Sequence, residues 1–376
     1  MNFQRKQKIE NELAPRRILM IYGPRRIGKT TMVKEYLASI SKDKKVKYDI
    51  GDDISLQQLL GKQERAPILD YVRPYDVIVI DEAQHIPNIG IAAKIMIDEF
   101  PEKIIILTGS SSFTLSQHVG EPLTGRQYQI NLLPLAQDEL YKNAYEKKQA
   151  LENTLLFGSY PEVLLTDDRL EKEKVLRELV SSYLFKDILS FDRLRSPELL
   201  LKITKAIAFQ IGSEVSINKL AKDVGENDPK KVARYLDLLE KSFVIKRVSA
   251  FSKNPRNEIR KKMKYYFYDM GLRNAVIDRF QILSNRDNKE IGGMWENFVF
   301  MELYKKYLFK NNYFTGIYFW RSIKGHEVDI IIENENELLA FECKWSMQNV
   351  IFTEYKKAYP NSTAYVVSRE NFTDFF

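Results

Sequence analysis

Residues 23–30, GPRRIGKT, combine two glycines, a lysine and a threonine at the spacing G-x-x-x-x-G-K-[ST]. Such glycines let the backbone curl until successive N–H groups point at phosphate oxygens. In this chemistry the lysine reaches the β- and γ-phosphates of a nucleotide and the threonine reaches Mg²⁺. The alternative is a glycine-rich turn that binds nothing. The candidate nucleotide contacts are Gly23, Pro24, Arg25, Arg26, Ile27, Gly28, Lys29, Thr30 and Thr31.

An acidic pair follows the apolar run Val77–Ile80. At the end of a buried strand, Asp81 would hold the Mg²⁺ of a phosphate-loop ATPase. Glu82 would polarise the attacking water as a general base. Taken alone, the pair also fits an ordinary strand followed by an acidic helix cap.

Two further polar positions belong to the same prediction. In an open α/β sheet the carboxyl ends of the strands line the ligand crevice. Ser110 or Ser111, after the apolar run KIIIL, would therefore sense the γ-phosphate, or one of them would simply cap the next helix. Arg126 precedes another expected strand and would neutralise transition-state charge, in cis or from a neighbouring subunit of an oligomer. A structural ion pair is the alternative for this arginine.

A second candidate site lies near the end of the chain. Residues 327–333 and 338–344 are expected to form a hairpin with a four-residue turn. In that register Glu333 opposes Leu338, and Asp329 opposes Glu342, with Lys344 two residues further on the same face. Opposed carboxylates repel unless a divalent cation offsets them. We therefore predict Asp329 and Glu342 as metal ligands and all three residues as catalytic; Glu296 lies upstream, near the start of an expected amphipathic helix.

The alternative is the polar side of a half-exposed hairpin, which alternates polar and apolar residues by default. In that case Lys344 would pair with Glu327 or Glu342. The other face of the hairpin, with Val328, Ile330 and Ile332 on its first strand, is expected to be core. The three histidines lie far apart in the sequence and indicate no zinc site.

The elements that must position these groups follow from local patterns. We expect strands at 17–22 and 77–80 and a helix at 31–40. Residues 131–190 are rich in helix formers and would form a helical lid. Ser196 and Pro197 mark the start of a helix over 198–209. Helices at 218–224 and from 229 to about 241 follow, and SFVIKRVSAF would form a β-wing, which gives a DNA-binding architecture or a helical spacer.

Basic residues gather in two of these segments. The last of the three helices would present Lys230, Lys231 and Arg234 to nucleic acid. The run from Lys253 to Lys264 carries six cations against one acid and would neutralise phosphates, or form a solvated loop. The six are Lys253, Arg256, Arg260, Lys261, Lys262 and Lys264.

Composition sets the outer limits. The chain has 376 residues, enough for two or three domains. A hydrophobic content of 44% with 29% charged residues is typical of a globular protein, and the net charge of +7 permits a polyanionic partner. The single cysteine, Cys343, excludes an intrachain disulfide. With no apolar run of membrane-spanning length, we expect a cytoplasmic protein that does not enter a membrane.

Taken together, the segments GPRRIGKTT, IDEAQHI, LTGSSSFTLSQHVGEPLTGR, LLPLAQDEL and GSYPEV resemble a prokaryotic AAA+-type ATPase family. The later segments ARYLDLLEKSFVI, YYFYDMGLRNA, WENFVFMEL and FWRSIKGHEVDIII resemble the same family. The resemblance implies an α/β fold: a P-loop (AAA+-type) parallel-sheet ATPase domain with a helical lid, a winged-helix module and a C-terminal α/β restriction-endonuclease-like domain. Asp329 with Glu342-Cys-Lys344 is similar to the signature of restriction-type nucleases, a resemblance that implies Glu296 as a helper.

We accordingly place the ATPase core at 1–135, the lid and connector at 136–195, the winged helix at 196–252 and the nuclease-like domain at 253–376. The leading hypothesis is an enzyme that binds ATP/ADP and Mg²⁺, hydrolyses ATP and couples nucleotide state to DNA binding, with metal-dependent DNA cleavage as an extension. The alternative is a nucleotide-dependent switch whose C-terminal domains bind protein partners and cut nothing.

Overall fold

The structure is a computed structural model, and it describes residues 3–40, 42–110, 123–181, 196–252, 262–309, 315–335 and 337–376. The chain divides into two compact units. One holds residues 5–133 and 241–243, and the other holds residues 1–4, 134–240 and 244–376. Among the described helices, none combines the length and apolar character needed to cross a bilayer.

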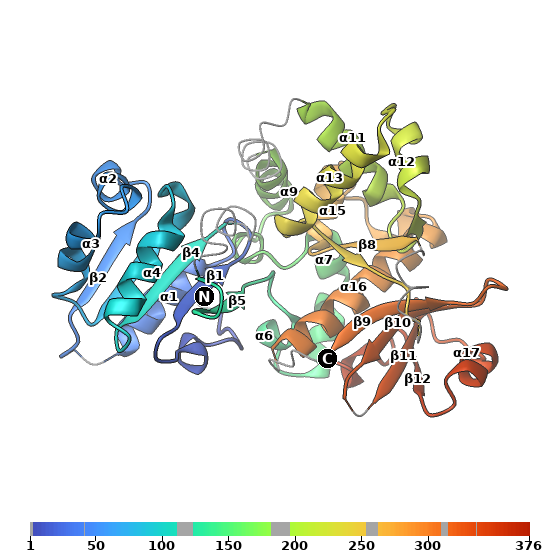
Figure 1. The fold of residues 1–376 in the computed structure, drawn as a ribbon. Helices are drawn as coiled ribbons and strands as arrows, with labels where there is room; N and C mark the ends of the chain where they lie inside the picture. Colours follow the sequence, from blue (N-terminus) through green and yellow to red (C-terminus); the bar gives the residue numbers. More distant parts are fainter. Residues whose placement is uncertain are drawn as a thin grey trace. The chain divides into compact units, whose positions relative to one another are not determined.

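The first unit is built on a five-stranded parallel sheet with the strand order β2-β3-β4-β1-β5 (Figure 1). The strands β1 and β3 are buried along their whole length, as expected for central strands of a parallel sheet made of Val, Ile and Leu. The strands are β1 Ile18–Tyr22, β2 Val46–Ile50, β3 Val77–Asp81, β4 Ile104–Gly109 and β5 Gln127–Asn131. The helices are η1 Ile9–Glu12, α1 Lys29–Ser39, α2 Ile54–Gly61, α3 Arg65–Val72, η2 Ala83–His85 and α4 Ile89–Glu99.

The second unit begins with helices and continues into a small three-stranded sheet with the order β6-β8-β7. Ser196 caps α11 by accepting the Leu199 N–H at 3.3 Å, with Pro197 in the first turn, as the sequence predicts. The elements are α6 Gln137–Leu140, α7 Ala144–Phe157, α8 Pro161–Leu164, α9 Arg169–Leu179, α11 Pro197–Phe209, β6 Glu214–Val215, α12 Ile217–Asp223, α13 Pro229–Lys241, β7 Ile245–Val248 and β8 Met263–Phe267.

The unit ends in a mixed four-stranded sheet with the order β12-β11-β10-β9. The predicted register of the hairpin is confirmed, because Glu333 pairs with Leu338. The elements are α15 Met270–Val276, η5 Leu283–Asn285, α16 Asn288–Leu308, β9 Gly316–Arg321, β10 Glu327–Glu333, β11 Leu338–Cys343, α17 Thr353–Ala358, β12 Thr363–Val367 and η6 Phe372–Asp374.

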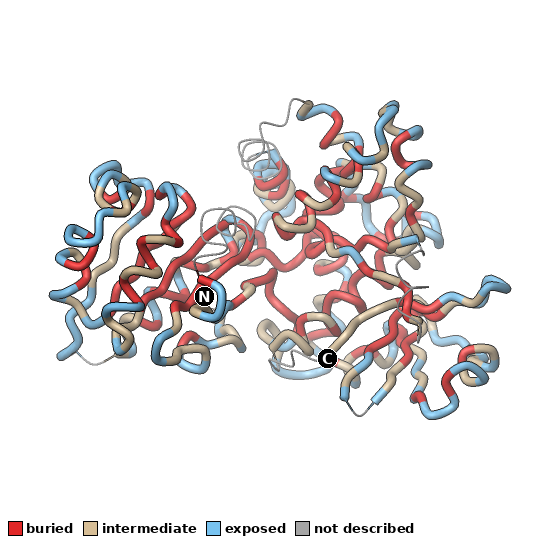
Figure 2. Tube along the Cα trace, viewed as in Figure 1, coloured by how far each residue is buried: buried red, intermediate tan, exposed pale blue. Residues whose placement is uncertain are grey.

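Helix α16 is the central element of the second unit. Every residue from Met294 to Leu303 is buried, including two glutamates, and Figure 2 shows this stretch in red. A helix that is apolar on all sides must be packed on all sides. Glu296 and Glu302 within it must therefore find partners inside the protein.

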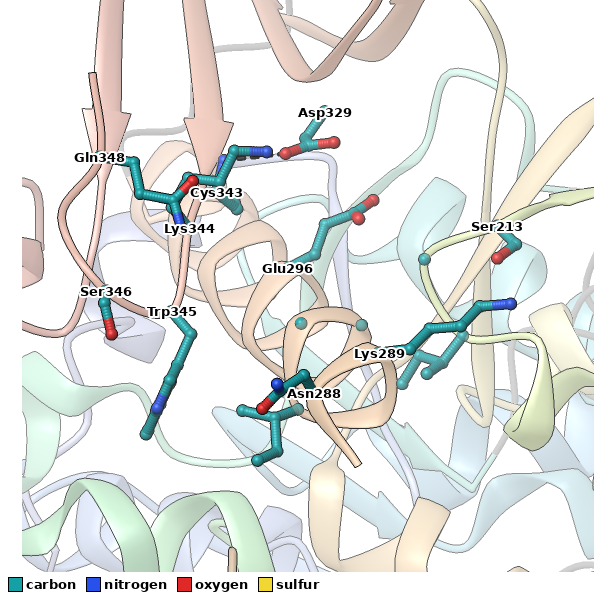
Figure 3. A pocket seen from close by; sticks show the side chains of 15 residues that line it. Ser213, Asn288, Lys289, Glu296, Asp329, Cys343, Lys344, Trp345, Ser346 and Gln348 are labelled. Carbon is teal, nitrogen blue, oxygen red and sulfur yellow. Dashed lines mark hydrogen bonds between the residues drawn. The ribbon is translucent and has the colours of Figure 1, made fainter. Parts of the chain in front are cut away.

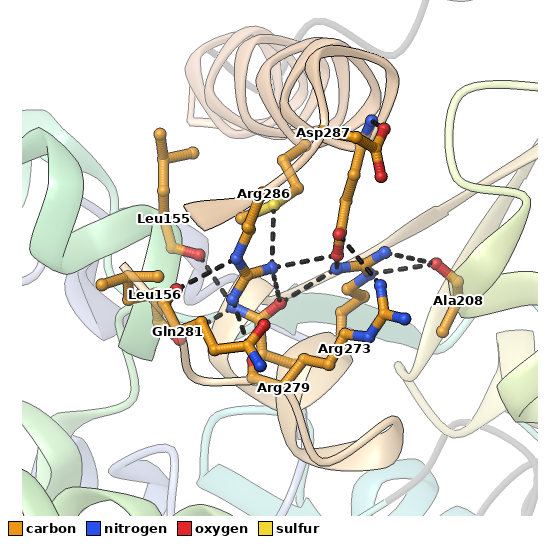
Figure 4. A network of polar contacts seen from close by, with 11 residues as sticks. Leu155, Leu156, Ala208, Arg273, Arg279, Gln281, Arg286 and Asp287 are labelled. Carbon is orange, nitrogen blue, oxygen red and sulfur yellow. Dashed lines mark hydrogen bonds and ion pairs between the residues drawn. The ribbon is translucent and has the colours of Figure 1, made fainter. Parts of the chain in front are cut away.

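Near its start, α16 carries Glu290, which is paired with three arginines (Figure 4). The Glu290 carboxylate lies 2.7 Å from Arg273 Nη1 and 3.0 Å from Arg286 Nη1. Arg273 also donates to the Ala208 carbonyl at the end of α11. Asn274 donates to the last carbonyls of α7, those of Leu155 and Leu156. The network thus joins the ends of three helices to α16.

A second buried polar contact involves two of the segments quoted from the sequence. The Asp269 carboxylate, just before α15, accepts the Ser159 N–H at 2.7 Å and the Leu272 N–H at 2.9 Å. Gly158 has a φ of +72°, and a Cβ there would overlap the Asp269 carboxylate. The segments FGSYPE and YDMGLRNA therefore pack against each other, and a glycine is required at the contact.

This contact generates a stability prediction. Gly158→Ala should lower the free energy of unfolding by at least about 3 kcal/mol, because the new methyl group meets a buried carboxylate and the backbone is in the left-handed region. Gly225→Ala is the matched control: its φ is +74°, but nothing lies within 4 Å of the added Cβ. The control should lose only about 1 kcal/mol. Equal losses in urea denaturation would show that the contact with Asp269 contributes nothing.

Candidate nucleotide site and C-terminal acid cluster

The phosphate loop joins the end of β1 to the start of α1. Gly28, with a φ of +98°, is the residue before the helix. The Lys29 side chain is buried, and its ammonium donates to the carbonyls of Gly23 at 2.9 Å and Pro24 at 3.0 Å. The ammonium thus lies inside the curve of the loop, beside the backbone N–H groups that are predicted to bind phosphate. This arrangement can hold a polyphosphate at the positive end of α1.

Asp81, at the end of β3, is brought directly to this loop. Its Oδ2 accepts the Thr30 hydroxyl at 2.6 Å and the Tyr48 hydroxyl at 2.8 Å, and Oδ1 accepts the Thr108 hydroxyl. Burial alone would raise the pKa of Asp81, but these three hydrogen bonds outweigh burial and lower it. Thr30 and the ionised Asp81 carboxylate together offer oxygen ligands of the kind that Mg²⁺ prefers.

Glu82 follows with a left-handed backbone, at φ 50° and ψ 43°. Its N–H donates to the Thr108 hydroxyl at 3.1 Å, and its carboxylate accepts the Gln84 side-chain amide. The same amide lies 3.3 Å from the Ser110 hydroxyl. Ser110 is buried in the same row of strand ends, while Ser111 falls outside the described residues.

Three of these groups were missed by reasoning from the sequence. Thr108 lies in the quoted segment LTGSSS, one strand from Asp81, and its position before the strand end was a usable signal. Gln84 lies two residues beyond Glu82 and was also available. Tyr48 comes from β2, at the edge of the sheet, and nothing in its local sequence marks it.

Arg126 does not lie where it could act on a nucleotide bound to its own chain, so that part of its prediction is wrong. Arg126 precedes β5, and in a parallel sheet the residue before a strand lies at the amino edge. Asn131 at the other end of β5 pairs with Tyr22, which leads into the phosphate loop. Five strand residues, about 16 Å, therefore separate Arg126 from the carboxyl edge. Its Nε instead lies 2.6 Å from Asp98 Oδ1 in a partly exposed ion pair.

In the second unit, the structure brings together the acids predicted at the C-terminal hairpin. Asp329 Oδ2 accepts the Cys343 N–H at 2.8 Å, which places it against β11. Glu342 Oε1 accepts from the Lys344 ammonium at 2.8 Å, while Glu342 Oε2 is buried without a hydrogen-bond partner. Burial, followed by the nearby Asp329 charge, raises the pKa of Glu342 to about 7.

The prediction that Val328, Ile330 and Ile332 are core is confirmed, since all three are buried, but the opposite face of β10 is not purely polar because Ile331 is buried as well. The register of β10 against β9 shifts between Val328 and Ile331. Because of this irregularity, Val328 and Ile331 enter the same hydrophobic cluster, with Trp320 and Tyr355. Asp329, at 14% side-chain exposure, is enclosed rather than solvated.

Lys264 is the largest departure from the sequence prediction. It was grouped with the basic run, of which Lys253, Arg256, Arg260 and Lys261 lie outside the described residues. Lys264 is instead on β8 with a side chain 1% exposed, so it cannot contact a phosphate backbone. Its ammonium lies 2.8 Å from Glu296 Oε1, 2.5 Å from Glu327 Oε1 and 3.9 Å from Asp329 Oδ1.

Burial sets the protonation of this cluster. Desolvation raises the pKa of Glu296 to about 8, although Lys264 acts in the opposite direction. Burial would lower the pKa of Lys264, but the charges of Glu296, Asp329 and Glu327 outweigh it and raise the pKa above its usual value. The ammonium therefore stays charged.

A pocket of about 530 Å³ opens beside the cluster (Figure 3). Glu296 and Asp329 contribute to its wall, together with Lys344, Trp345 and Lys289. Glu342 is not part of the lining. Within the described part of the chain, no group of three or more His, Cys, Asp or Glu side chains is arranged to hold a metal ion.

Comparison with known proteins agrees with the nucleotide site. Residues 15–141 match a family model described as an AAA domain. Residues 148–282 and 291–375 match two models described as domains of unknown function, DUF8612 and DUF4143. The N-terminal part of the chain is thus similar to an AAA domain over the residues that carry the phosphate loop and Asp81.

Similar proteins extend over most of the chain. An uncharacterized protein of Methanocaldococcus jannaschii is 26% identical over 362 residues, covering 89% of this chain and 76% of its own. An uncharacterized protein of Haemophilus influenzae is 23% identical over 340 residues, covering 86% and 81%. Among solved structures, domain III of the replication initiation protein DnaA from Thermotoga maritima matches at 15% identity, with a TM-score of 0.26 and coverage of 58% of this chain and 82% of that one.

The nucleotide site generates a prediction about hydrolysis. Lys29→Ala should weaken ATP binding at least about tenfold, since a buried cation at the phosphates is lost. Glu82→Gln should retain ATP binding but reduce turnover by about 10²-fold or more, because the amide is a poor base. Lys34→Ala, an exposed lysine of the same helix, is the control and should change neither. Wild-type turnover in Glu82→Gln would remove Glu82 from the role of base.

The ion pair of Arg126 generates a second prediction. Arg126→Ala should lower stability by less than about 1 kcal/mol, as expected for a partly exposed pair, and should leave ATP turnover unchanged in dilute protein. Asp98→Ala breaks the same pair but keeps the arginine. If Arg126 acts in trans, turnover per molecule will rise with protein concentration in wild type and Asp98→Ala but not in Arg126→Ala. Loss of turnover in dilute Arg126→Ala would contradict its placement at the far edge.

Proposed function

We propose that this protein hydrolyses ATP with Mg²⁺ and uses the nucleotide state to control DNA binding. The observation that carries the first part is the hydrogen bond between Thr30 of the phosphate loop and Asp81 at the end of β3. It joins the residue types expected to hold Mg²⁺ at the positive end of α1, next to Lys29. The Mg²⁺ would neutralise phosphate charge, and Thr30 and Asp81 would hold it.

Nucleotide binding would change the hydrogen-bond partners of Lys29. Its ammonium donates to two loop carbonyls, of Gly23 and Pro24. A β- or γ-phosphate oxygen is a stronger, charged acceptor for the same protons. We infer that nucleotide binding draws the lysine from these carbonyls to phosphate and leaves the loop N–H groups to surround the rest.

Glu82 and Ser110 would act as a linked pair. Gln84 is hydrogen-bonded to the Glu82 carboxylate and lies at 3.3 Å from the Ser110 hydroxyl. A change at Ser110 when γ-phosphate is present would therefore reach the base that orients the attacking water. This role for Ser110 is favoured over a helix cap because its side chain is buried beside Gln84.

The DNA-binding part of the proposal rests on the small sheet and its helices. The order α11, β6, α12, α13, β7 and β8, with β6-β8-β7 as one antiparallel sheet, is the order expected for a winged helix. Lys230 and Arg234 are exposed on α13, while Lys231 is engaged by Glu226 at 2.7 Å. We propose α13 as the surface that meets the phosphate backbone. The proposal keeps the domain boundaries after residues 135, 195 and 252.

The alternative, a nucleotide-dependent switch that binds protein partners and cuts nothing, is favoured by the ion pair between Lys344 and Glu342. A lysine that is already paired is not available to a scissile phosphate. The restriction-endonuclease-like fold is still proposed for the C-terminal sheet and α16, because it gathers Glu296, Asp329 and Glu342 in one region. Cleavage is not part of the proposed function.

DNA binding is tested by its salt dependence. Binding of duplex DNA should weaken steeply as salt rises, because each neutralised phosphate releases counterions. Lys230→Glu should weaken binding and reduce the slope of log K against log[salt] by about 1 or more. Lys324→Glu, an exposed lysine near the turn between β9 and β10, is the charge-matched control. Absence of DNA binding at low salt, with and without ATP, would favour the switch that binds proteins.

A further inference from the structure

The acid cluster of the C-terminal sheet already has a cation at its centre. Lys264 comes from β8, Glu296 from α16, and Glu327 and Asp329 from β10. The Lys264 ammonium is within hydrogen-bonding distance of Glu296 and Glu327, and its third carboxylate neighbour is Asp329 at 3.9 Å. Three acids from two elements thus converge on one nitrogen atom supplied by a third element.

Two of the carboxylate oxygens in the cluster already accept hydrogen bonds from protein donors. Glu296 Oε1 accepts from Lys264 and from the Tyr266 hydroxyl at 2.6 Å. Asp329 Oδ2 accepts the Cys343 N–H. A hard cation such as Mg²⁺ requires several oxygens at about 2.0–2.1 Å, and here an ammonium lies among them. The donor set therefore does not fit the metal that a restriction-endonuclease-like site implies.

We propose that Lys264 is the permanent counter-charge of this cluster and replaces the divalent cation, so that the C-terminal domain is a metal-independent binding module. This inference goes beyond the ATP-driven function proposed above and does not depend on it. An ammonium carries one charge and cannot act as a Lewis acid on a phosphate. The site is therefore built for stability and recognition rather than for cleavage.

The origin of Lys264 adds a second consequence. Because the lysine belongs to the three-stranded sheet, its ion pairs hold that sheet against α16 and the four-stranded sheet. Arg321 at the end of β9 adds to this, lying 3.5 Å from Glu214 of β6 and 3.5 Å from Glu327. A metal would bind the acids to one another, whereas Lys264 binds them to a neighbouring part of the unit.

The test is calorimetric titration of Mn²⁺ into the full chain without nucleotide. Wild type should show no Mn²⁺ binding that depends on Asp329, so wild type and Asp329→Asn should give the same heats. Lys264→Met removes the ammonium that the three acids share and leaves Arg321 as the remaining cation beside Glu327, near the buried Glu342 Oε2 that has no hydrogen-bond partner. It should acquire a Mn²⁺ site at least about tenfold tighter than any in wild type, and Lys264→Met with Asp329→Asn should lose it.

Lys262→Met is the matched control, since Lys262 is an exposed lysine two residues earlier in the same basic run. It should behave as wild type. Lys264→Gln, which keeps a hydrogen-bond donor, serves as the second variant, and circular dichroism checks that each variant is folded. Thermal unfolding gives an independent readout: Mn²⁺ should raise the melting temperature of folded Lys264→Met or Lys264→Gln more than that of wild type.

Two results would overturn the proposal. One is Mn²⁺ binding by wild type that disappears in Asp329→Asn, because the cluster would then accept a metal in the presence of Lys264. The other is a folded Lys264→Met or Lys264→Gln that gains no affinity for Mn²⁺, because the ammonium would then not be what occupies the cation position. Neither result bears on ATP hydrolysis, which is measured separately through Lys29 and Glu82.

Discussion

A charge removed from water must be paired, and this constraint organises the second unit around α16. The helix is continuously buried from Met294 to Leu303, and it carries Glu290, Glu296 and Glu302. Each carboxylate meets a different partner: arginines from the region of α15, Lys264 of β8, and the Gln137 N–H with Lys305. Because an unpaired buried charge is so costly, these pairs fix which element lies against which part of the helix. The apolar surface alone would allow several packings, and the glutamates select one.

In the first unit, the direction of the strands determines where the candidate nucleotide site lies. Parallel strands present their carboxyl ends at one edge, so the loop after β1, Asp81 at the end of β3 and Ser110 after β4 meet at the same edge of the sheet. These three could be predicted from the sequence, since each follows an apolar run. Arg126 was misplaced because it precedes its strand, and the same reasoning applied to β5 would have put it at the opposite edge. Tyr48 could not be predicted, because its role depends on β2 being the neighbour of β3.

In the second unit, local pattern predicted local structure well. The hairpin register, the Ser196 cap and the helices α11, α12 and α13 all follow from residue spacing. Lys264 could not be predicted, because its partners lie 32 and more residues away and a run of basic residues normally indicates solvent exposure. The shift in β10 was also hidden, since an irregular register changes which side chains share a face without changing the composition of the strand. Gly158 and Asp269 stood in quoted motifs whose structural role appears only when the two segments meet.

The chain leaves β7 and continues beside β9, and this pairing has an evolutionary consequence. The Phe251 N–H donates to the Phe319 carbonyl at 2.6 Å, and the Phe319 N–H donates to the Ser249 carbonyl at 3.2 Å. Together with the ion pairs of Lys264, this backbone pairing connects the small sheet directly to the C-terminal sheet. A gene rearrangement that exchanged one sheet alone would expose the edge of a β-strand. It would also separate Glu296, Glu327 and Asp329 from the Lys264 ammonium. The two sheets are therefore expected to be inherited together.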